Sequence, residues 1–367
     1  MQTATRDQHI TPSSGKARPD LAALTALIAA GAPRLEEERR LSAGLATTLA
    51  GHGLFRMLVP RALGGGEVAP AALLDTIETL AAADGSVAWC VMVCATTGML
   101  AACLDEEAAA EIFGDPDAIV GGVAAPRGVG VARGDGVEVS GRWPWASASA
   151  VCTWLMAGFR GGTAGEGPHL AFLPARQVRL IDDWFPAGLR GTGSGTFEAA
   201  GLFAPARRTC AMSVKPRAGA SPLYAIAPNV MGALCMASVG CGLARAAFDA
   251  IAAQIEPNDQ AMASIAEALA RQCAARALLR EQVQLAWEKA CAGDDLPTAT
   301  IAHLRLAAVH AARTSADTCR SLQDMAGGAG VPFDSPLARR ARDAQTVTAH
   351  ALVSPRLYQQ LGEQLLG

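Results

Sequence analysis

The sequence has few charged residues and no block of lysine and arginine. Charged residues make up 18% of the 367 positions, and 31 basic against 34 acidic residues leave a formal net charge of -3. Nucleic acids and anionic membranes are recognised mainly through clustered positive charge. The composition therefore argues against both as partners.

The sequence also lacks the cysteine spacing of a metal or redox motif. Its ten cysteines include no C-x-x-C pair, and none has a histidine nearby at ligand spacing. Most stand in apolar surroundings, where a thiol behaves as a small buried hydrophobe. We therefore expect a reduced, cytoplasmic protein that holds no metal.

An apolar targeting segment is missing from the first residues. Residues 1–17 are polar and are predicted to form a disordered tail, neither signal peptide nor anchor. Residues 86–104 are apolar enough to raise the question of a membrane span. Their Ser86, Thr96 and Thr97, with the acidic residues on both sides, favour a buried helix instead.

The pattern of apolar residues predicts an α+β protein in three parts. Residues 18–117 have helical periodicity, with Leu21, Leu24 and Ile28 on one face. Residues 118–213 contain short β-rich runs without intervening helices, which is typical of an antiparallel sandwich or barrel. Residues 220–367 are helical again, and four long stretches predict a four-helix bundle. These stretches are 224–255, 261–290, 298–325 and 335–366.

The segment from Gly141 to Ser149 holds two tryptophans and two serines. In an extended chain, Ser147 points to the same side as Trp145. An indole beside a hydroxyl suits a flat ring with a polar edge. The alternative is a β-turn in which the serine caps backbone groups and the tryptophan fills the core.

This segment resembles the flavin-facing strand of the acyl-CoA dehydrogenase superfamily. There a glycine is followed four residues later by tryptophan and two residues further by threonine or serine, as in Gly141, Trp145 and Ser147. The order of helical, β and bundle parts fits this superfamily over nearly the whole chain after residue 20. The Trp-Pro-aromatic-Ala-Ser variant is most similar to its flavin-dependent two-component (group D) monooxygenase branch.

The resemblance implies roles for several residues. Trp145 would cover the isoalloxazine ring, and the Ser147 hydroxyl would bond the N5 edge, acting in binding and in catalysis. Ser149 would face the edge of the ring or simply end a strand. The turn that starts at Gly188 is similar to the superfamily's Gly-x-Arg-x-Thr-Gly-Ser turn, so Thr192 and Ser194 would meet flavin or phosphate. A plain glycine-rich turn is the alternative.

His350 is the second catalytic candidate. It lies seven residues after Asp343, where dehydrogenases of the superfamily carry glutamate. Their second place for a base, within residues 221–236, also holds no acid. Removing an α-proton requires a base. The lack of a carboxylate at both positions therefore argues against acyl-CoA dehydrogenation. An imidazole would orient or deprotonate an oxygen acceptor, since its ordinary pKa of about 6.5 allows proton exchange near neutrality. A helix histidine bonded to a backbone carbonyl is the alternative.

The residues that bind the cofactor's phosphates are not evident. Arg276 and Arg280 share a helix face and could meet a phosphate of a neighbouring subunit, or they could pair with Glu267 or Glu281. The superfamily's Phe-Gly-Lys stretch is missing before this helix. Both FMN and FAD therefore stay open as cofactors.

The sequence thus predicts a flavin-dependent monooxygenase that oxygenates an aromatic or apolar small molecule beside residues 89–99. The resemblance implies a separate flavin reductase that supplies reduced flavin, O2 as co-substrate, and a homotetramer. One alternative is an FAD-dependent acyl-CoA dehydrogenase whose base sits elsewhere. Another is a non-catalytic binding or structural subunit on the same fold.

Overall fold

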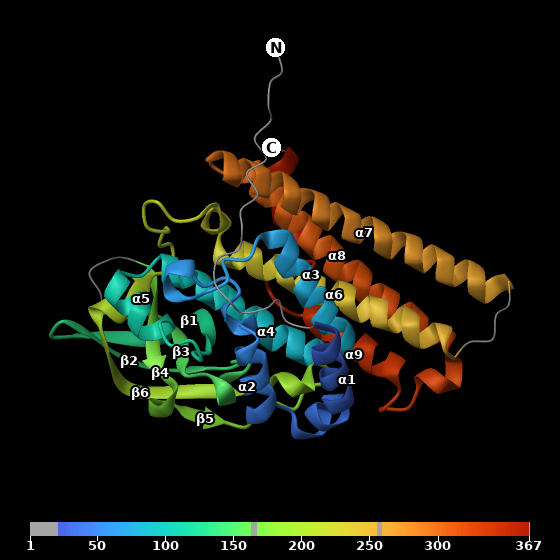
Figure 1. Cartoon of the computed structure of the whole chain (residues 1–367), viewed down its shortest axis with the longest axis horizontal. Helices are drawn as coiled ribbons and strands as arrows, with labels where there is room; N and C mark the ends of the chain where they lie inside the picture. The colour runs from blue at the N-terminus through green and yellow to red at the C-terminus, as the bar shows by residue number, and fades with distance from the viewer. Residues whose placement is uncertain (1–20, 163–166, 255–258, 367) are drawn as a thin grey trace, which may run out of the picture.

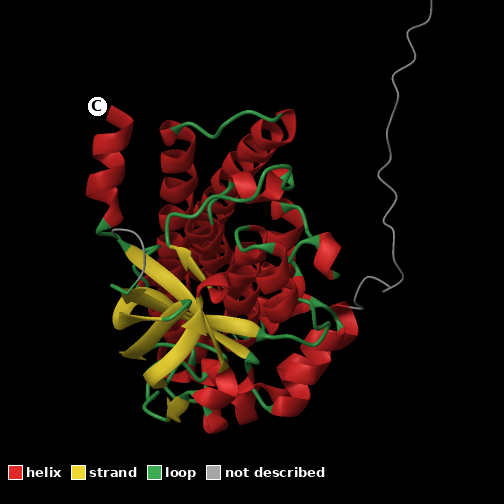
Figure 2. Cartoon of the chain, turned by 90° about the vertical axis from the view of Figure 1, so that its left-hand side faces the viewer, coloured by secondary structure: helices red, strands yellow, loops and turns green. Residues whose placement is uncertain are grey.

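Helices and strands occupy different parts of the molecule (Figures 1 and 2). The computed structural model describes residues 21–162, 167–254 and 259–366, so the predicted tail at 1–17 lies outside the described residues. The helices are α1 (Leu21–Glu38), α2 (Ala43–Gly51), α3 (Pro70–Ala83), α4 (Gly85–Thr97), α5 (Glu106–Phe113), α6 (Pro228–Ala252), α7 (Asp259–Ala292), α8 (Thr298–Met325), α9 (Pro336–Thr348) and α10 (Leu357–Leu366). The strands are β1 (Val120–Arg133), β2 (Gly136–Trp143), β3 (Trp154–Arg160), β4 (Pro168–Pro174), β5 (Arg179–Ile181), β6 (Thr196–Pro205) and β7 (Thr209–Ala211).

The strands form one seven-stranded sheet in the order β5-β6-β2-β1-β3-β4-β7. The α+β fold class is confirmed, but the sheet is not wholly antiparallel as predicted, because β1 and β3 run parallel from Val120 opposite Trp154. The chain does not turn directly from β2 into β3. Residues 144–153 return to the start of β1, where the Thr153 N–H donates to the Ile119 carbonyl at 2.8 Å.

Helix α4 is the central helix between the sheet and the bundle. Asp84 caps its first turn by accepting the Val87 N–H at 3.0 Å. Its residues are almost all buried, and it packs against β1 on one side and against α6 and α9 on the other (Figure 1). Residues 85–102 and α6 are long and apolar enough to cross a membrane, yet 89% of each window is buried inside this fold. Such burial is typical of core helices.

The C-terminal helices differ from the prediction at the end of the chain. The stretch predicted as one helix over 335–366 divides into α9 and α10, because the chain turns after Thr348 and Pro355 lies within the connection. Helix α10 packs on α8 through Leu361, which contacts a small cluster containing Ala302 and Val309. His350 therefore lies in a turn and not in a helix.

Helix α6 approaches α3 closely. A Cβ atom on Gly242 would lie 2.3 Å from the Glu78 carbonyl oxygen, so only glycine fits there. Glu78 is buried, and both Arg276 and Arg280 of α7 bond its carboxylate at 2.9 to 3.0 Å. The prediction that these arginines pair with Glu267 or Glu281 is wrong, because they join α7 to α3.

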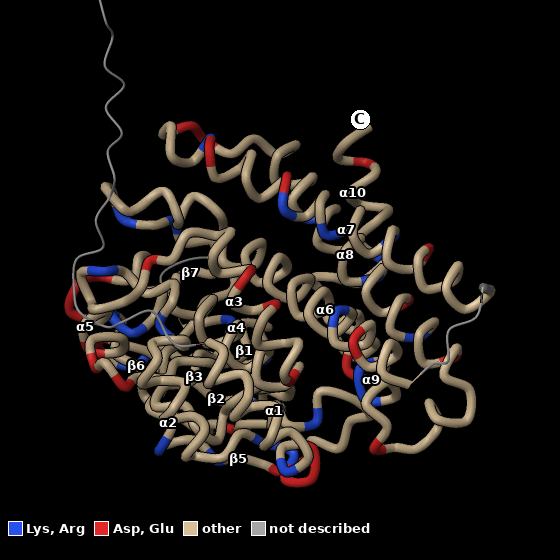
Figure 3. The backbone as a smooth tube through the Cα atoms, turned by 45° about the vertical axis from the view of Figure 1, so that its right-hand side comes forward, with Lys and Arg blue, Asp and Glu red and all other residues tan. Residues whose placement is uncertain are grey.

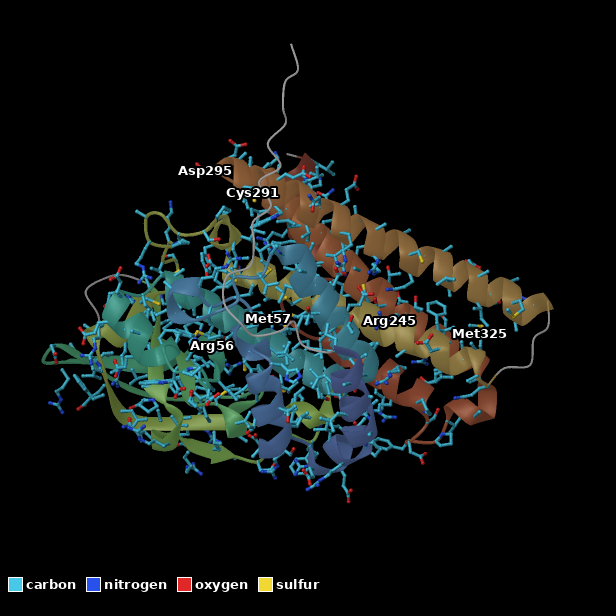
Figure 4. All side chains as sticks on the ribbon, viewed as in Figure 1. Arg56, Met57, Arg245, Cys291, Asp295 and Met325 are labelled. Atoms are coloured by element: carbon cyan, nitrogen blue, oxygen red, sulfur yellow. The ribbon has the colours of Figure 1, made fainter. Side chains whose placement is uncertain are left out.

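Charged residues are interspersed along the chain, as the composition predicts (Figure 3). Arg56, labelled in Figure 4, is one of several charged residues that are buried. Its guanidinium donates to the carbonyls of Phe113 and Asp115 at 2.7 and 2.8 Å, and to that of Leu63. These bonds join the end of α5 to residues 56–63. They also compensate the free-energy cost of burying the Arg56 charge.

A buried ionic cluster connects α9 to three other parts of the fold. Arg339 of α9 pairs with Asp84 at the start of α4 and lies 3.3 Å from Glu36 of α1. It also lies 3.9 Å from Asp343, whose other oxygen accepts the Leu189 N–H at 2.6 Å. Burial raises the pKa of Asp343 to about 6, and the Arg339 charge opposes that rise. Glu36 also pairs with Arg190 and Arg342, so Arg339 is the main counter-charge of the two fully buried carboxylates, Asp84 and Asp343.

We predict that Arg339→Ala lowers the free energy of unfolding by about 3 to 5 kcal/mol, since it leaves buried carboxylates without a counter-charge. Urea denaturation measures this loss. In the control Arg320→Ala, which removes an exposed pair with Asp324 on α8, the loss should stay below about 1 kcal/mol.

The Arg339→Ala loss should also depend on pH. The folded-state pKa of Asp343 lies above its ordinary value, so protonation favours the folded state, and that stabilisation disappears as the pH rises through about 6. At pH 5 the folded chain holds Asp343 protonated, and a neutral carboxyl needs no counter-charge from Arg339. The loss of stability in Arg339→Ala should therefore be smaller at pH 5 than at pH 8. Equal losses at both pH values would contradict the role assigned to Asp343.

Candidate functional site

The segment after β2 turns sharply. Trp143, the last residue of β2, enters the core, where it stacks on Phe197 with ring centroids 4.8 Å apart. Trp145 then adopts a left-handed conformation with φ of 66°. The expectation that Trp145 and Ser147 point to the same side of an extended chain is therefore wrong. The Trp145 side chain is exposed, at 63%, whereas Ser147 is buried, at 4%.

The turn is held against a second turn that the sequence also singled out. The Ala146 N–H donates to the Gly195 carbonyl and the Ala148 N–H to the Thr192 carbonyl, both at 2.9 Å. The second turn begins at Leu189, which has a left-handed φ of 52° and is fixed by its bond to Asp343. The two predicted motifs are thus brought together by backbone bonds.

Four side chains form a continuous chain of hydrogen bonds across these turns. The indole N–H of Trp89, on α4, donates to the Ser147 hydroxyl at 3.0 Å. The Ser147 and Ser194 hydroxyls lie 2.7 Å apart, and those of Ser194 and Thr192 lie 2.6 Å apart. The Thr192 hydroxyl donates to the Leu189 carbonyl at 2.8 Å. All four side chains are buried. Ser149 is buried in the next turn and takes no part in this chain of bonds.

His350 contacts the same tryptophan from another side. The rings of His350 and Trp89 meet edge to face, with centroids 5.8 Å apart. The His350 Nδ1 atom accepts the Leu352 N–H at 3.2 Å, which assigns the ring hydrogen to Nε2. Burial lowers the pKa of His350 to about 4. The imidazole is therefore neutral at neutral pH, and proton exchange near neutrality, which its ordinary pKa suggests, does not apply.

The exposed ring of Trp145 can stack on a flat partner. Trp145 offers an exposed aromatic surface, with the Arg127 guanidinium 5.2 Å from its ring centroid. An exposed indole on a strained backbone is costly unless something covers it. The Ser147 hydroxyl, two residues on, is buried and bonds Trp89 and Ser194.

Trp89 is the member of the site whose role sequence reasoning missed. The sequence placed it only within the apolar residues 89–99. The available signal was chemical, because an indole N–H on a fully buried helix requires an acceptor. Which hydroxyl accepts it depends on a turn far along the chain, and the sequence does not reveal that.

Comparison with known proteins gives one family and close relatives. Residues 234–355 match the family model for the acyl-CoA dehydrogenase C-terminal domain. The chain is 33% identical over 348 residues to indole-3-acetate monooxygenase of Pseudomonas putida, covering 90% of this chain and 89% of the relative. It is 28% identical over 360 residues to the flavin-dependent monooxygenase oxygenase subunit HsaA of Mycobacterium tuberculosis, covering 90% of both. The crystal structure of 3-HSA hydroxylase from Rhodococcus sp. RHA1 matches with a TM-score of 0.89 at 25% identity, covering 95% of both chains.

We predict that His350 makes folding sensitive to mild acid. Between about pH 4 and pH 6.5 the unfolded chain binds a proton on this histidine and the folded chain does not, so the contribution of His350 to stability is complete above pH 6.5 and is lost as the pH falls toward 4. From pH 7 to pH 5 the wild type should lose about 1 to 2 kcal/mol more than His350→Asn, as measured by urea unfolding.

The control for this prediction is His52→Asn, which replaces an exposed histidine in the turn after α2. It should follow the wild type at both pH values. If His350→Asn loses as much free energy of unfolding between pH 7 and pH 5 as the wild type does, His350 is not held neutral by burial.

Proposed function

The chain belongs to the flavin-dependent monooxygenases that share the acyl-CoA dehydrogenase fold, and we propose that it oxygenates a small aromatic molecule with reduced flavin supplied by a separate reductase. It is a flavin-dependent oxidoreductase. The alternative of an acyl-CoA dehydrogenase gains no support from the relatives, which are monooxygenases. These relatives give no support to the alternative of a non-catalytic subunit either.

The observation that carries the proposal is the position of Trp89. Its N–H bonds Ser147, the residue expected at the flavin N5 edge, and its ring contacts His350, the residue expected at the acceptor. One indole therefore separates the two candidate groups. An acceptor lying beside Trp89 would be within reach of the flavin edge, which a transfer between the two requires.

Residues of the two turns would hold the cofactor. Trp145 would pack on the isoalloxazine ring, and Ser147 would bond its N5 edge, with Thr192, Ser194 and Ser149 around it. Bound reduced flavin supplies two electrons, so that one oxygen atom of O2 enters the acceptor and the other leaves as water. FMN and FAD both stay possible, because Arg276 and Arg280 are engaged with Glu78 and no phosphate contact follows from them.

His350 would orient the acceptor by donating a hydrogen bond. With Nδ1 engaged by the Leu352 N–H and the pKa near 4, the ring offers Nε2–H at neutral pH and takes up a proton poorly. An aromatic acceptor with an oxygen substituent matches such a donor. Two relatives, one named for indole-3-acetate and one for resorcinol, support this class of acceptor.

We further propose that the protein acts in the cytoplasm as a homotetramer with no metal. The long exposed face of α7, which carries Met262, Leu269 and Leu285, supports such an assembly because a partner would cover these apolar side chains. Gel filtration with light scattering tests the tetramer, and a monomer would contradict it.

The test of the function is a reconstituted reaction. The protein, a flavin reductase, NADH, FMN or FAD and labelled O2 are mixed with a panel of indole and phenol carboxylic acids, and products are identified by mass spectrometry. One labelled oxygen atom in a product supports the proposal. Reduction of bound flavin by an acyl-CoA without any reductase, and no labelled product, would contradict it.

We predict that His350→Ala lowers product formation about ten- to hundredfold while flavin binding changes less than twofold, because it removes the acceptor's hydrogen-bond partner and not the cofactor's. Ser147→Ala should instead weaken flavin binding. Ser140→Ala, which alters an exposed serine of β2, is the matched control and should leave both quantities unchanged. An unchanged product rate in His350→Ala would remove His350 from the reaction.

A further inference from the structure

Helix α6 contains three glycines, and packing explains two of them. A Cβ atom on Gly240 would lie 3.1 Å from the Ser315 Cβ atom of α8, and one on Gly242 would meet the Glu78 carbonyl oxygen of α3 at 2.3 Å. Both glycines therefore let a neighbouring helix approach α6 closely. Gly232, in the second turn of α6, has no such close neighbour among the described residues.

The missing side chain of Gly232 leaves an internal space. Gly232 is buried, yet a Cβ atom there would meet one atom of the described chain within 4 Å beyond the adjoining residues of its own helix. That atom is the Leu352 Cδ1, at the ordinary van der Waals distance of 3.6 Å. Alanine would therefore fit, and it would stabilise the helix relative to glycine. Packing does not account for glycine at this position.

The space is linked to the residues expected at the acceptor. Leu352, whose side chain borders the space, donates its backbone N–H to the His350 Nδ1 atom at 3.2 Å. The His350 ring in turn contacts Trp89 edge to face. Helix α6, which carries Gly232, also packs against α4, which carries Trp89. A molecule that lies beside Trp89 and His350 is therefore close to the space at Gly232.

Solvent reaches the same side of α4. Eleven of the thirteen residues of α4 are buried, and the two exceptions are Val93 and Thr96. They follow Trp89 by four and seven residues, so the three side chains share one face of the helix. His350 and Leu352 also keep part of their surface exposed. A small molecule can therefore reach this face of α4 from outside.

We propose that Gly232 determines the size of the acceptor. The reacting ring of a bicyclic aromatic acceptor lies beside Trp89 and His350, and the far edge of its second ring enters the space between Gly232 and Leu352. A larger residue at position 232 restricts the site to acceptors with a single ring. This inference rests on the proposed function, because it assumes that the acceptor binds beside His350.

The test compares acceptors of two sizes. The reaction is reconstituted with a flavin reductase, NADH, flavin and labelled O2. The value of kcat/KM is then measured for bicyclic and for single-ring members of the panel of indole and phenol carboxylic acids. The readout is the ratio of the bicyclic to the single-ring value, because general damage to the protein lowers both values together.

The substitution Gly232→Val should lower kcat/KM for the bicyclic acceptor about 10- to 100-fold and that for the single-ring acceptor less than about threefold. The added methyl groups occupy the space that the second ring needs. Gly232→Ala adds one methyl group, so the ratio should fall about three- to tenfold. Gly232→Ala should also raise the melting temperature, and it keeps the test available if Gly232→Val does not fold.

Two further variants separate lost space from general damage. Gly44→Val places the same side chain on an exposed glycine of α2 with open surroundings, so it should leave the ratio unchanged. The double variant Gly232→Val with Leu352→Ala shortens the opposite side chain and returns the space. Its kcat/KM for the bicyclic acceptor should recover to within about threefold of the wild-type value. The Leu352→Ala change leaves in place the backbone N–H that holds His350.

The outcomes separate this inference from the proposed function. A wild type that forms no labelled product with any member of the panel would overturn the proposed function. A wild type that oxygenates only single-ring acceptors would overturn the inference and leave the function standing. Variants of Gly232 that keep the wild-type ratio would do the same. If only bicyclic acceptors react, the loss in Gly232→Val and its recovery in the double variant support the inference, and a loss without recovery contradicts it.

Discussion

The buried cluster around Arg339 is the constraint on which the site depends. Arg339 neutralises Asp84, which begins α4 and so sets the helix that carries Trp89. It also stands beside Asp343, which holds the turn that leads to Thr192 and Ser194. Helix α9, which carries the arginine, ends two residues before His350. The Arg339 guanidinium therefore contacts groups that hold each of the three segments of the candidate site.

The chemistry of the site is that of neutral groups held in fixed orientations. Burial keeps His350 uncharged, and its Nδ1 bond leaves one defined donor. The hydroxyls of Ser147, Ser194 and Thr192 are likewise oriented by partners that can only donate or only accept. Such groups need no reorganisation during a reaction, which is the main electrostatic advantage of an enzyme site over water.

Much of this could be predicted from the sequence, and the failures have physical causes. The periodicity of apolar residues predicted the α+β class, and the spacing of Trp145 and Ser147 led to the family. The local conformation of the same segment was predicted wrongly, because backbone bonds to residues 192 and 195 override the extended preference of β2. The parallel pairing of β1 with β3 and the break after Thr348 also depend on contacts distant in sequence. Trp89 illustrates the same limit, since its acceptor is a residue that only the folded chain brings near.

The separation of the site residues along the chain has a consequence for how the molecule matures. Trp89, Ser147 and Ser194 bond one another, whereas His350 reaches Trp89 only when α9 docks against α4. Contacts between distant residues form late in folding, because the closure entropy of long loops opposes them. The contact of His350 with Trp89 therefore joins residues about 260 positions apart and is expected to form after the bonds among Trp89, Ser147 and Ser194. The group expected at the acceptor would then be the last part of the candidate site to be placed, after the residues expected at the cofactor.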